Sequence, residues 1–154
     1  MQKFLIIGFT KKGGCWLIGL DNGLLCVNAP KTKEFESFRD EYHQENKIEI
    51  CYWRKCWDFR NEIISSGLGI DCSKVYNDKN PEDWIFLTIL QVEEFRNILA
   101  KYTDIEYVRE NNWDSIWIDE ELVDIMKTEL ERLDRFLMLM KQQPGLKVYF
   151  YDSY

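Results

Sequence analysis

The amino-acid sequence predicts an α+β fold in which an antiparallel sheet of five or six strands is packed by three or four helices. Three observations support this prediction. Short apolar runs bounded by turn residues lie near both ends of the sequence, residues 47–53 alternate with a period of two, and a long amphipathic stretch covers residues 120–141. No repeat, low-complexity tract or interdomain linker interrupts the pattern, so residues 1–154 are expected to form a single α+β domain.

The first 28 residues are expected to form a three-stranded meander. Lys3–Thr10 is rich in β-forming residues and is followed by a Gly-Gly turn. Cys15–Leu20 and Leu24–Asn28 flank Asn22-Gly23, and Asn-Gly between apolar runs is a strong hairpin signal because both residues tolerate positive φ.

Residues 30–53 predict a short helix and then a strand. Phe35, Phe38 and Tyr42 recur at helical spacing, which is typical of an aromatic stripe that packs on a core. The following segment, Lys47–Trp53, alternates as a strand does. Its two faces carry Ile48, Ile50 and Tyr52 on one side and Glu49, Cys51 and Trp53 on the other.

The middle of the sequence predicts two further helices separated by a loop and a strand. A helical stripe from Cys56 to Ile63 ends at Ser65-Ser66-Gly67. Residues 67–81 are rich in turn formers and predict a surface loop, which leads to a strand at Trp84–Leu87. Thr88 and Gln91 then fit a capping box, which opens a helix with its apolar positions at Val92, Phe95, Leu99 and Tyr102.

The longest helix is expected from about Glu120 to about Lys141. Pro144-Gly145 ends it, and Leu146–Tyr151 alternates as a final strand with Val148 and Phe150 inward and Tyr149 and Tyr151 outward. The apolar face of the helix consists of Leu122, Ile125, Met126, Leu130, Leu133, Leu137 and Met140.

The charge balance excludes one broad class of partner. The chain has 27 acidic and 20 basic residues, a net charge of −7. A general nucleic-acid binder needs a basic face for phosphate contacts, so this class is not expected. A net negative charge is compatible with docking on a basic protein.

Composition also limits the catalytic chemistry and the compartment. His43 is the only histidine, so serine or cysteine catalysis with an imidazole base and His-rich metal sites have one candidate at most. The cysteines are five in number, form no CxxC pair and lie in apolar stretches, which favours reduced core thiols in a cytoplasm. No apolar run is long enough to span a bilayer, and the amino-terminal segment lacks the pattern of a signal peptide. We therefore expect a cytoplasmic protein without a membrane partner.

The densest candidate site for a small molecule lies where the strand at 47–53 leads into the next helix. It consists of Tyr52, Trp53, Arg54, Lys55 and Arg60. Arg54 and Lys55 have the charges to bind a phosphate or carboxylate, and Trp53 or Trp57 has a flat ring for stacking. The alternative is structural: the aromatic rings belong to the core, and the arginines pair with acidic side chains of the chain itself.

A second candidate surface is acidic and lies on the long helix. The start of that helix carries four carboxylates, where they stabilise the helix dipole: Asp119, Glu120, Glu121 and Asp124. The last three are the candidate partner-binding residues. Divalent-metal binding is a weaker alternative for the same group. The outward residues Tyr149 and Tyr151 are candidates to extend this surface, because tyrosine contributes a large contact area at little entropic cost. No cofactor is expected, and no catalytic residues are assigned.

One segment resembles a known family. Residues 49–56, Glu-Ile-Cys-Tyr-Trp-Arg-Lys-Cys, resemble the E-[VI]-x-Y-W-R-K-A segment of a family of small, uncharacterised proteins of tailed bacteriophages and prophages. The resemblance covers residues 47–154 loosely, with the run at 113–141 and the aromatic segment at 148–154 similar to later parts of the family. The family's histidine falls on Arg60 and its next tryptophan on Glu62, so no imidazole role carries over. The resemblance implies a phage or prophage setting, and no reaction.

Two functions are therefore expected as alternatives. The first is a phage accessory protein, of an anti-defence kind, that captures a phosphate-bearing small ligand such as a signalling nucleotide at Tyr52–Lys55. The second is an acidic inhibitor or immunity-type protein that docks on a basic host enzyme or toxin. An enzyme ranks third, since no acid–base pair stands at a recognisable spacing. The sequence leaves the oligomeric state open.

Overall fold

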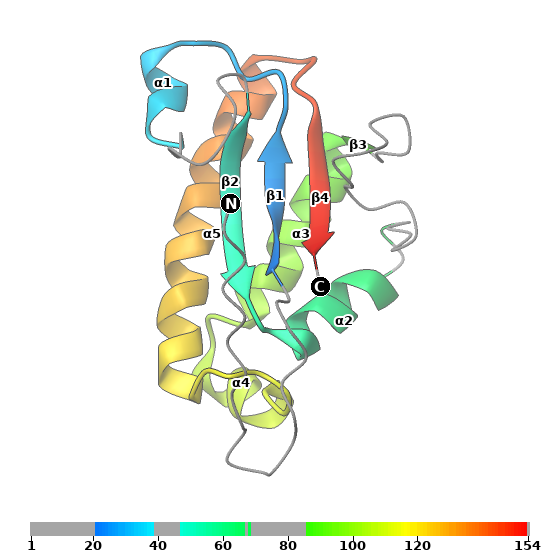
Figure 1. Ribbon diagram of the computed structural model, residues 1–154, viewed down its shortest axis with the longest axis vertical. Coiled ribbons are helices and arrows are strands. Elements are labelled where there is room, and N and C mark those ends of the chain that lie inside the picture. The colour runs from blue at the N-terminus through cyan, green and yellow to red at the C-terminus, as the bar shows by residue number, and fades with distance from the viewer. Residues whose placement is uncertain (1–20, 39–46, 67, 69–85, 154) are drawn as a thin grey trace.

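The computed structural model describes residues 21–38, 47–66, 68 and 86–153, and in these residues it has the predicted α+β class (Figure 1). They contain four strands and five helices. In chain order these are β1 (Asp21–Cys26), α1 (Lys33–Glu36), β2 (Ile48–Arg54), α2 (Trp57–Ser65), β3 (Phe86–Leu87), α3 (Ile89–Lys101), α4 (Ile105–Asn111), α5 (Asp119–Gln142) and β4 (Val148–Ser153).

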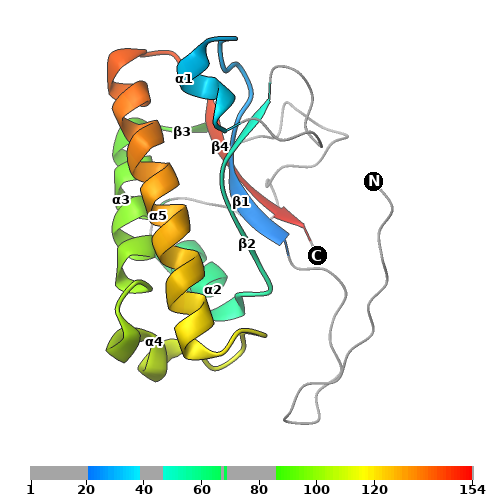
Figure 2. The ribbon, with the colours of Figure 1, turned by 90° about the vertical axis from the view of Figure 1, so that its left-hand side faces the viewer.

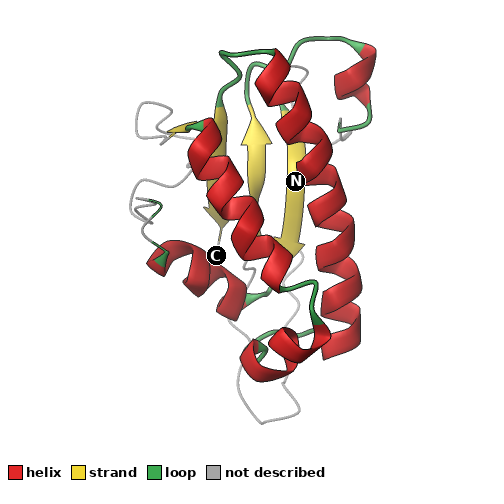
Figure 3. Ribbon diagram, turned by 180° about the vertical axis from the view of Figure 1, so that it is seen from behind, coloured by secondary structure: helices red, strands yellow, loops and turns green. Residues whose placement is uncertain are grey.

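The sheet is antiparallel, with the strand order β2-β1-β4-β3. Helices α3 and α5 cover one of its faces, as Figures 2 and 3 show. The described sheet thus has four strands rather than the predicted five or six. The strands predicted at residues 3–10 and 15–20, and most of the loop predicted at 67–81, lie outside the described residues.

The predicted hairpin turn at Asn22-Gly23 is wrong. Both residues lie within β1, the strand between β2 and β4, where Gly23 pairs with Tyr52 on one side and Tyr151 on the other. A Cβ atom at Gly23 would lie 2.5 Å from the carbonyl oxygen of Cys51 and 2.6 Å from a ring carbon of Tyr151. The glycine therefore serves close packing in the sheet and not a reversal of the chain.

A β-bulge changes which side chains of β2 point into the core. Leu24 pairs with Cys51 and Leu25 with Glu49, so Ile50 is an extra residue on β2. Beyond the bulge the alternation is reversed, and Trp53 is buried while Tyr52 is not. The prediction that Tyr52 shares a face with Ile48 and Ile50 is wrong for this reason.

Aromatic rings form the centre of the core between the sheet and the helices. The ring of Trp53 lies 4.6 Å from that of Phe59, 5.4 Å from that of Phe95 and 6.4 Å from that of Phe150, measured between centroids. These four residues come from β2, α2, α3 and β4. Such ring pairs stabilise a core beyond the area that they bury.

The helices follow the sequence signals to different degrees. At α3 both hydrogen bonds of the predicted capping box between Thr88 and Gln91 are present. Helix α5 begins and ends within one residue of the predicted helix, and its predicted apolar face is buried or half-buried. Helix α1 has four residues, and its Phe35 packs edge-on against Phe136 of α5, as does Phe38, which lies just after the helix.

Helix α4 was not predicted and brings the number of described helices to five rather than three or four. Asp104 caps it by accepting a hydrogen bond from the backbone N–H of Glu106. With seven residues and one fully buried side chain, Val108, it has too short an apolar repeat to stand out in the sequence.

Helix α5 also covers the outer edge of β2. The carboxylate of Glu129 accepts a hydrogen bond of 2.8 Å from the backbone N–H of Tyr52. The guanidinium of Arg132 donates one of 2.9 Å to the carbonyl of Glu49. Two backbone groups of β2, which is an edge strand of the described sheet, are thus paired with side chains of the helix.

Among the helices at 33–36, 57–65, 89–101, 105–111 and 119–142, none is both long enough and apolar enough to cross a bilayer.

Candidate functional site

The structure separates the aromatic residues of the predicted small-molecule site. Tyr52 and Trp53 are consecutive in β2, so their side chains point to opposite faces of the sheet. Trp53 is 1% exposed among the core rings. Its ring therefore has no face to offer a ligand, which corrects its assignment as a stacking residue.

The three cations of that site have different surroundings. Lys55 is 8% exposed and has a left-handed backbone, with φ 54°, at the junction of β2 and α2. Arg54 is half-buried. The guanidinium of Arg60 lies 5.6 Å from the centre of the Trp57 ring and donates a 3.4 Å hydrogen bond to Asn61. The sequence brings these residues together, but the structure buries Lys55, half-buries Arg54 and places Arg60 beside the Trp57 ring.

The backbone of the same junction holds the loop at 112–118, between α4 and α5. The indole of Trp117 donates a 2.9 Å hydrogen bond to the carbonyl of Arg54. The N–H of Ile116 donates to the carbonyl of Lys55 at 3.4 Å, and Cys56 pairs with Ser115 in an isolated β-bridge. The backbone of residues 54–56 therefore holds the loop at 112–118 in place.

Two further side chains fix this loop. One carboxylate oxygen of Asp58 accepts hydrogen bonds from the backbone N–H groups of Trp113 and Asp114, at 2.8 and 2.7 Å. The side-chain amide of Asn112 donates to the carbonyl of Trp117 at 3.0 Å and to the carboxylate of Asp119 at 2.9 Å. The loop is tied to α2 at one point and closed on itself at another.

Residues 104–124, which we call the acidic end, hold the charge excess of the chain. They contain eight carboxylates and one arginine, a net charge of −7 that equals that of the whole chain. The guanidinium of Arg109 forms ion pairs with the carboxylates of Glu106, at 2.7 Å, and Glu120, at 3.8 Å, measured between nitrogen and oxygen. The predicted partner-binding residues Glu120, Glu121 and Asp124 are all exposed, and so is the loop residue Asp114.

The acidic end also exposes large apolar side chains. Trp113 is 68% exposed and Ile118 is 57% exposed, and both lie in the loop at 112–118. Neither residue was among the predicted site residues. The loop that carries them is held by Asp58, which is more than 50 positions away in the sequence, and by the local hydrogen bonds of Asn112.

The predicted outward tyrosines of β4 are not an exposed surface. Tyr149 and Tyr151 share the face opposite Phe150, as predicted, but Tyr149 is fully buried and lies edge-on to Phe86 at 6.1 Å. Tyr151 is half-buried across Gly23 and donates a 3.4 Å hydrogen bond to Glu49 of β2. Tyr149 is thus corrected from a partner residue to a packed one.

A carboxylate cluster that the sequence did not reveal joins three helices. Glu62 of α2 accepts hydrogen bonds from Lys101 at 2.8 Å, Tyr102 at 2.9 Å and Tyr107 at 2.8 Å. Partial burial alone would raise the pKa of Glu62, but these three donors outweigh it and lower the pKa below its usual value. Burial and the carboxylate raise the pKa of Tyr107 to about 12. Every member of the cluster is hydrogen-bonded within it, which indicates a structural role.

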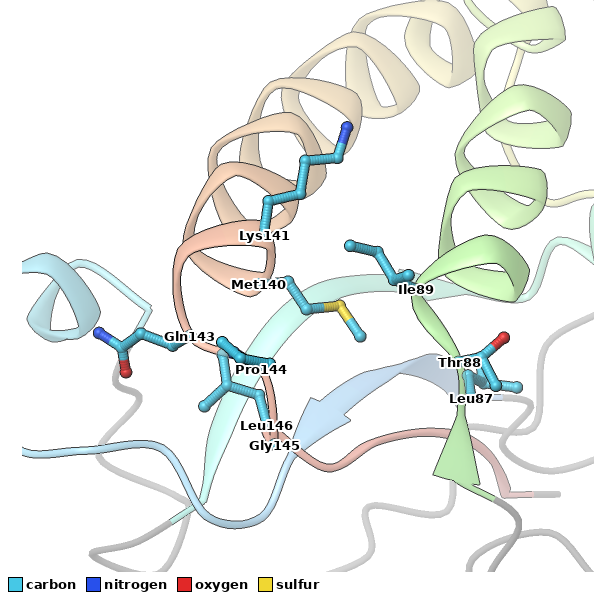
Figure 4. Close-up of a pocket in the computed structure, with 9 residues that line it drawn as sticks. All are labelled: Leu87, Thr88, Ile89, Met140, Lys141, Gln143, Pro144, Gly145 and Leu146. Atoms are coloured by element: carbon cyan, nitrogen blue, oxygen red, sulfur yellow. The ribbon is translucent and has the colours of Figure 1, made fainter.

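A pocket of about 380 Å³ lies at the other end of α5 (Figure 4). Figure 4 shows Ile89 and Met140 pointing toward one another across it, with Pro144 and Leu146 beside them. Gly145, with φ 109°, turns the chain there. The lining is mainly apolar, and the ammonium of Lys141 is paired with Glu93 at 2.9 Å.

The described cysteines are buried and free, in agreement with the predicted core thiols. Burial raises the pKa of Cys26 to about 11 and that of Cys56 to about 12, and burial together with Glu129 holds that of Cys51 well above its usual value. These groups are thiols at neutral pH and poor nucleophiles. His43, Cys15 and Cys72 lie outside the described residues.

Within the described ranges, no three His, Cys, Asp or Glu side chains are grouped as metal ligands. Comparisons of the chain with protein-family models, with curated proteins and with solved structures found no match.

Proposed function

We propose that the chain is a binding protein that docks on a basic protein partner through the acidic end. The observation that carries the proposal is the placement of a net charge of −7 on 21 consecutive residues that also expose Trp113 and Ile118. Charge of one sign on one end of a molecule steers an oppositely charged partner toward it. Exposed apolar side chains within such a region supply the burial that holds the complex.

Small-molecule capture at Tyr52–Lys55 has less support. It needs a ring and two cations around one ligand, whereas Trp53 fills the core and Lys55 is 8% exposed. A phage or prophage setting, and an anti-defence or immunity-type role within it, are part of the proposal and rest on the YWRK segment alone.

Charge reversal tests the docking function. Glu121→Lys with Asp124→Lys changes the acidic end, and Glu94→Lys with Glu131→Lys makes the same change of net charge at exposed positions of α3 and α5 outside it. Each form is used to capture proteins from the cells that express it, at low salt. We expect the wild type and the control to recover a basic protein, and the acidic-end variant to lose it.

High salt should also release that protein, because exposed charges are screened within about 8 Å at physiological ionic strength and over less at higher salt. Equal capture by both variants, capture of acidic proteins only, or no capture by the wild type would each contradict the proposal. A thermal melt of each variant confirms that it is folded.

A further inference from the structure

We propose that Trp113 is the ring on which an arginine of the partner stacks, so that the acidic end selects arginine over lysine. This inference rests on the proposed docking function and names the chemistry of the partner: an arginine-bearing segment of a basic protein. Three observations carry it, namely the exposure of Trp113, the way in which its backbone and indole are held, and the carboxylates next to it in the sequence.

The indole of Trp113 is held at its edge while most of the residue is exposed. Its Nε1–H donates a 2.7 Å hydrogen bond to the carbonyl of Glu110, the last residue but one of α4. The residue nevertheless remains 68% exposed, against 39% for Phe86, the other large exposed aromatic residue of the described chain. A ring that is fixed at one edge loses less conformational entropy when a partner covers it.

The backbone at Trp113 is fixed before any partner binds. Asp58 accepts from the N–H groups of both Trp113 and Asp114, and Asn112 closes the loop from the other side. The energetic cost of ordering this loop is therefore met by folding rather than by binding.

The surroundings favour a cation of planar shape. Tryptophan is the best aromatic platform for a cation, and arginine stacks on it more often than lysine does. Two exposed acidic residues are close to Trp113 in the sequence: Asp114 follows it directly, and Glu110, whose carbonyl accepts from the indole, lies three positions before it. A guanidinium has five N–H donors in one plane, so it can bind a carboxylate while its face lies on the ring, whereas an ammonium lacks this geometry.

The described part of the chain contains cation–π contacts of both kinds in its own fold. The guanidinium of Arg135 lies 5.1 Å from the centre of the Phe38 ring. The ammonium groups of Lys147 and Lys101 lie 5.5 and 5.9 Å from the centres of the Phe86 and Tyr107 rings. The contact on a tryptophan is made by an arginine, since the guanidinium of Arg60 lies 5.6 Å from the centre of the Trp57 ring. These contacts are within the usual cation–π range of about 6 Å.

Two peptides of equal length and charge test the inference, one with arginines and one with lysines at the same positions. Their affinities for the whole chain are measured by calorimetry at about 0.15 M salt. We expect the arginine peptide to bind about two- to fivefold more tightly, which corresponds to one exposed cation–π contact. In Trp113→Leu this preference should disappear, and in Trp113→Tyr part of it should remain.

Leu90→Ala is the matched control, because Leu90 is 72% exposed on α3, outside the acidic end. It should retain the full preference for arginine. Equal affinity of the two peptides for the wild type, or an unchanged preference in Trp113→Leu, would overturn the role of Trp113 and leave the docking function standing. If neither peptide binds, or if Glu121→Lys with Asp124→Lys leaves binding unaltered, the docking function itself fails.

Discussion

At the scale of single residues, Gly23 allows the close packing of β1 against β2 and β4. Tyr52, Gly23 and Tyr151 form one cross-strand row, and Tyr151 lies over the glycine and reaches Glu49. An aromatic ring that covers a glycine on the neighbouring strand shields its backbone and aligns the strands. The residue that looked like a turn former is the one that allows this arrangement.

Gly23→Ala is expected to lower the free energy of unfolding by about 1–3 kcal/mol, as overpacking of a closed site does. The new methyl group meets the carbonyl of Cys51, which belongs to the backbone of β2 and cannot turn away. Adding Tyr151→Ala should not restore stability, because the carbonyl stays in place. Urea unfolding of the three forms measures this, and a Gly23→Ala variant as stable as the wild type would refute it.

The residue scale also shows why the ligand hypothesis misplaced its key ring. The alternation of residues 47–53 was visible in the sequence, and β2 forms there. The bulge at Ile50 depends on pairing with Leu24 and Leu25, residues that lie some 25 positions earlier, so no local pattern reveals it. One inserted residue exchanged the faces of Tyr52 and Trp53.

At the scale of elements, the signals that were confirmed are local and those that were missed are not. The capping box of α3 and the apolar repeat of α5 arise from residues within a few turns of one another, and both were predicted. The joint between α2, α3 and α4 rests on Glu62, whose partners lie 39 to 45 positions away. A single glutamate in a helix gives no sign of such partners.

Glu62→Gln is expected to destabilise the protein by about 1–2 kcal/mol near neutral pH, since hydrogen bonds to a charged group are stronger than those to an amide. The pKa of Glu62 is lowered in the folded protein, so its stabilising effect is complete above the usual value of 4.5 and is lost as the pH falls through the lower folded value. The difference in the free energy of unfolding between the wild type and Glu62→Gln should therefore become smaller in acid.

Chemical unfolding at neutral pH and again below pH 4.5 measures this difference. Glu94→Gln, an exposed change on α3, serves as the control and should have little effect at either pH. A difference that is constant with pH would show that Glu62 does not act through its charge.

At the scale of the whole molecule, the excess of acidic charge and the apolar pocket lie at opposite ends of α5. Helix α5 has 24 residues and a length of about 36 Å, with the acidic end at its start and the apolar pocket beside its last turn. The rest of the chain carries equal numbers of acidic and basic residues. The sequence predicted an acidic docking helix from the net charge, but the loop that carries the exposed apolar side chains beside it is held by Asp58, more than 50 positions away.

The sheet predicts an order of stability that hydrogen exchange can measure. Strand β1 lies between β2 and β4 and is paired along its whole length on both sides, whereas β3 has two residues at an edge and α1 has four. We expect the slowest amide exchange in β1 and the fastest, among the described elements, in β3 and α1. Faster exchange in β1 than in β4 would contradict the strand order.

The hydrogen bonds from Glu129 and Arg132 to β2 bear on how the protein behaves at high concentration. A bare strand at the edge of a sheet is a template to which another chain can add, and repeated addition ends in fibrils. Here a carboxylate and a guanidinium of α5 occupy two of the backbone positions that an incoming strand would need. Helix α5, whose first residues belong to the acidic end, thus also hinders the addition of another chain to β2.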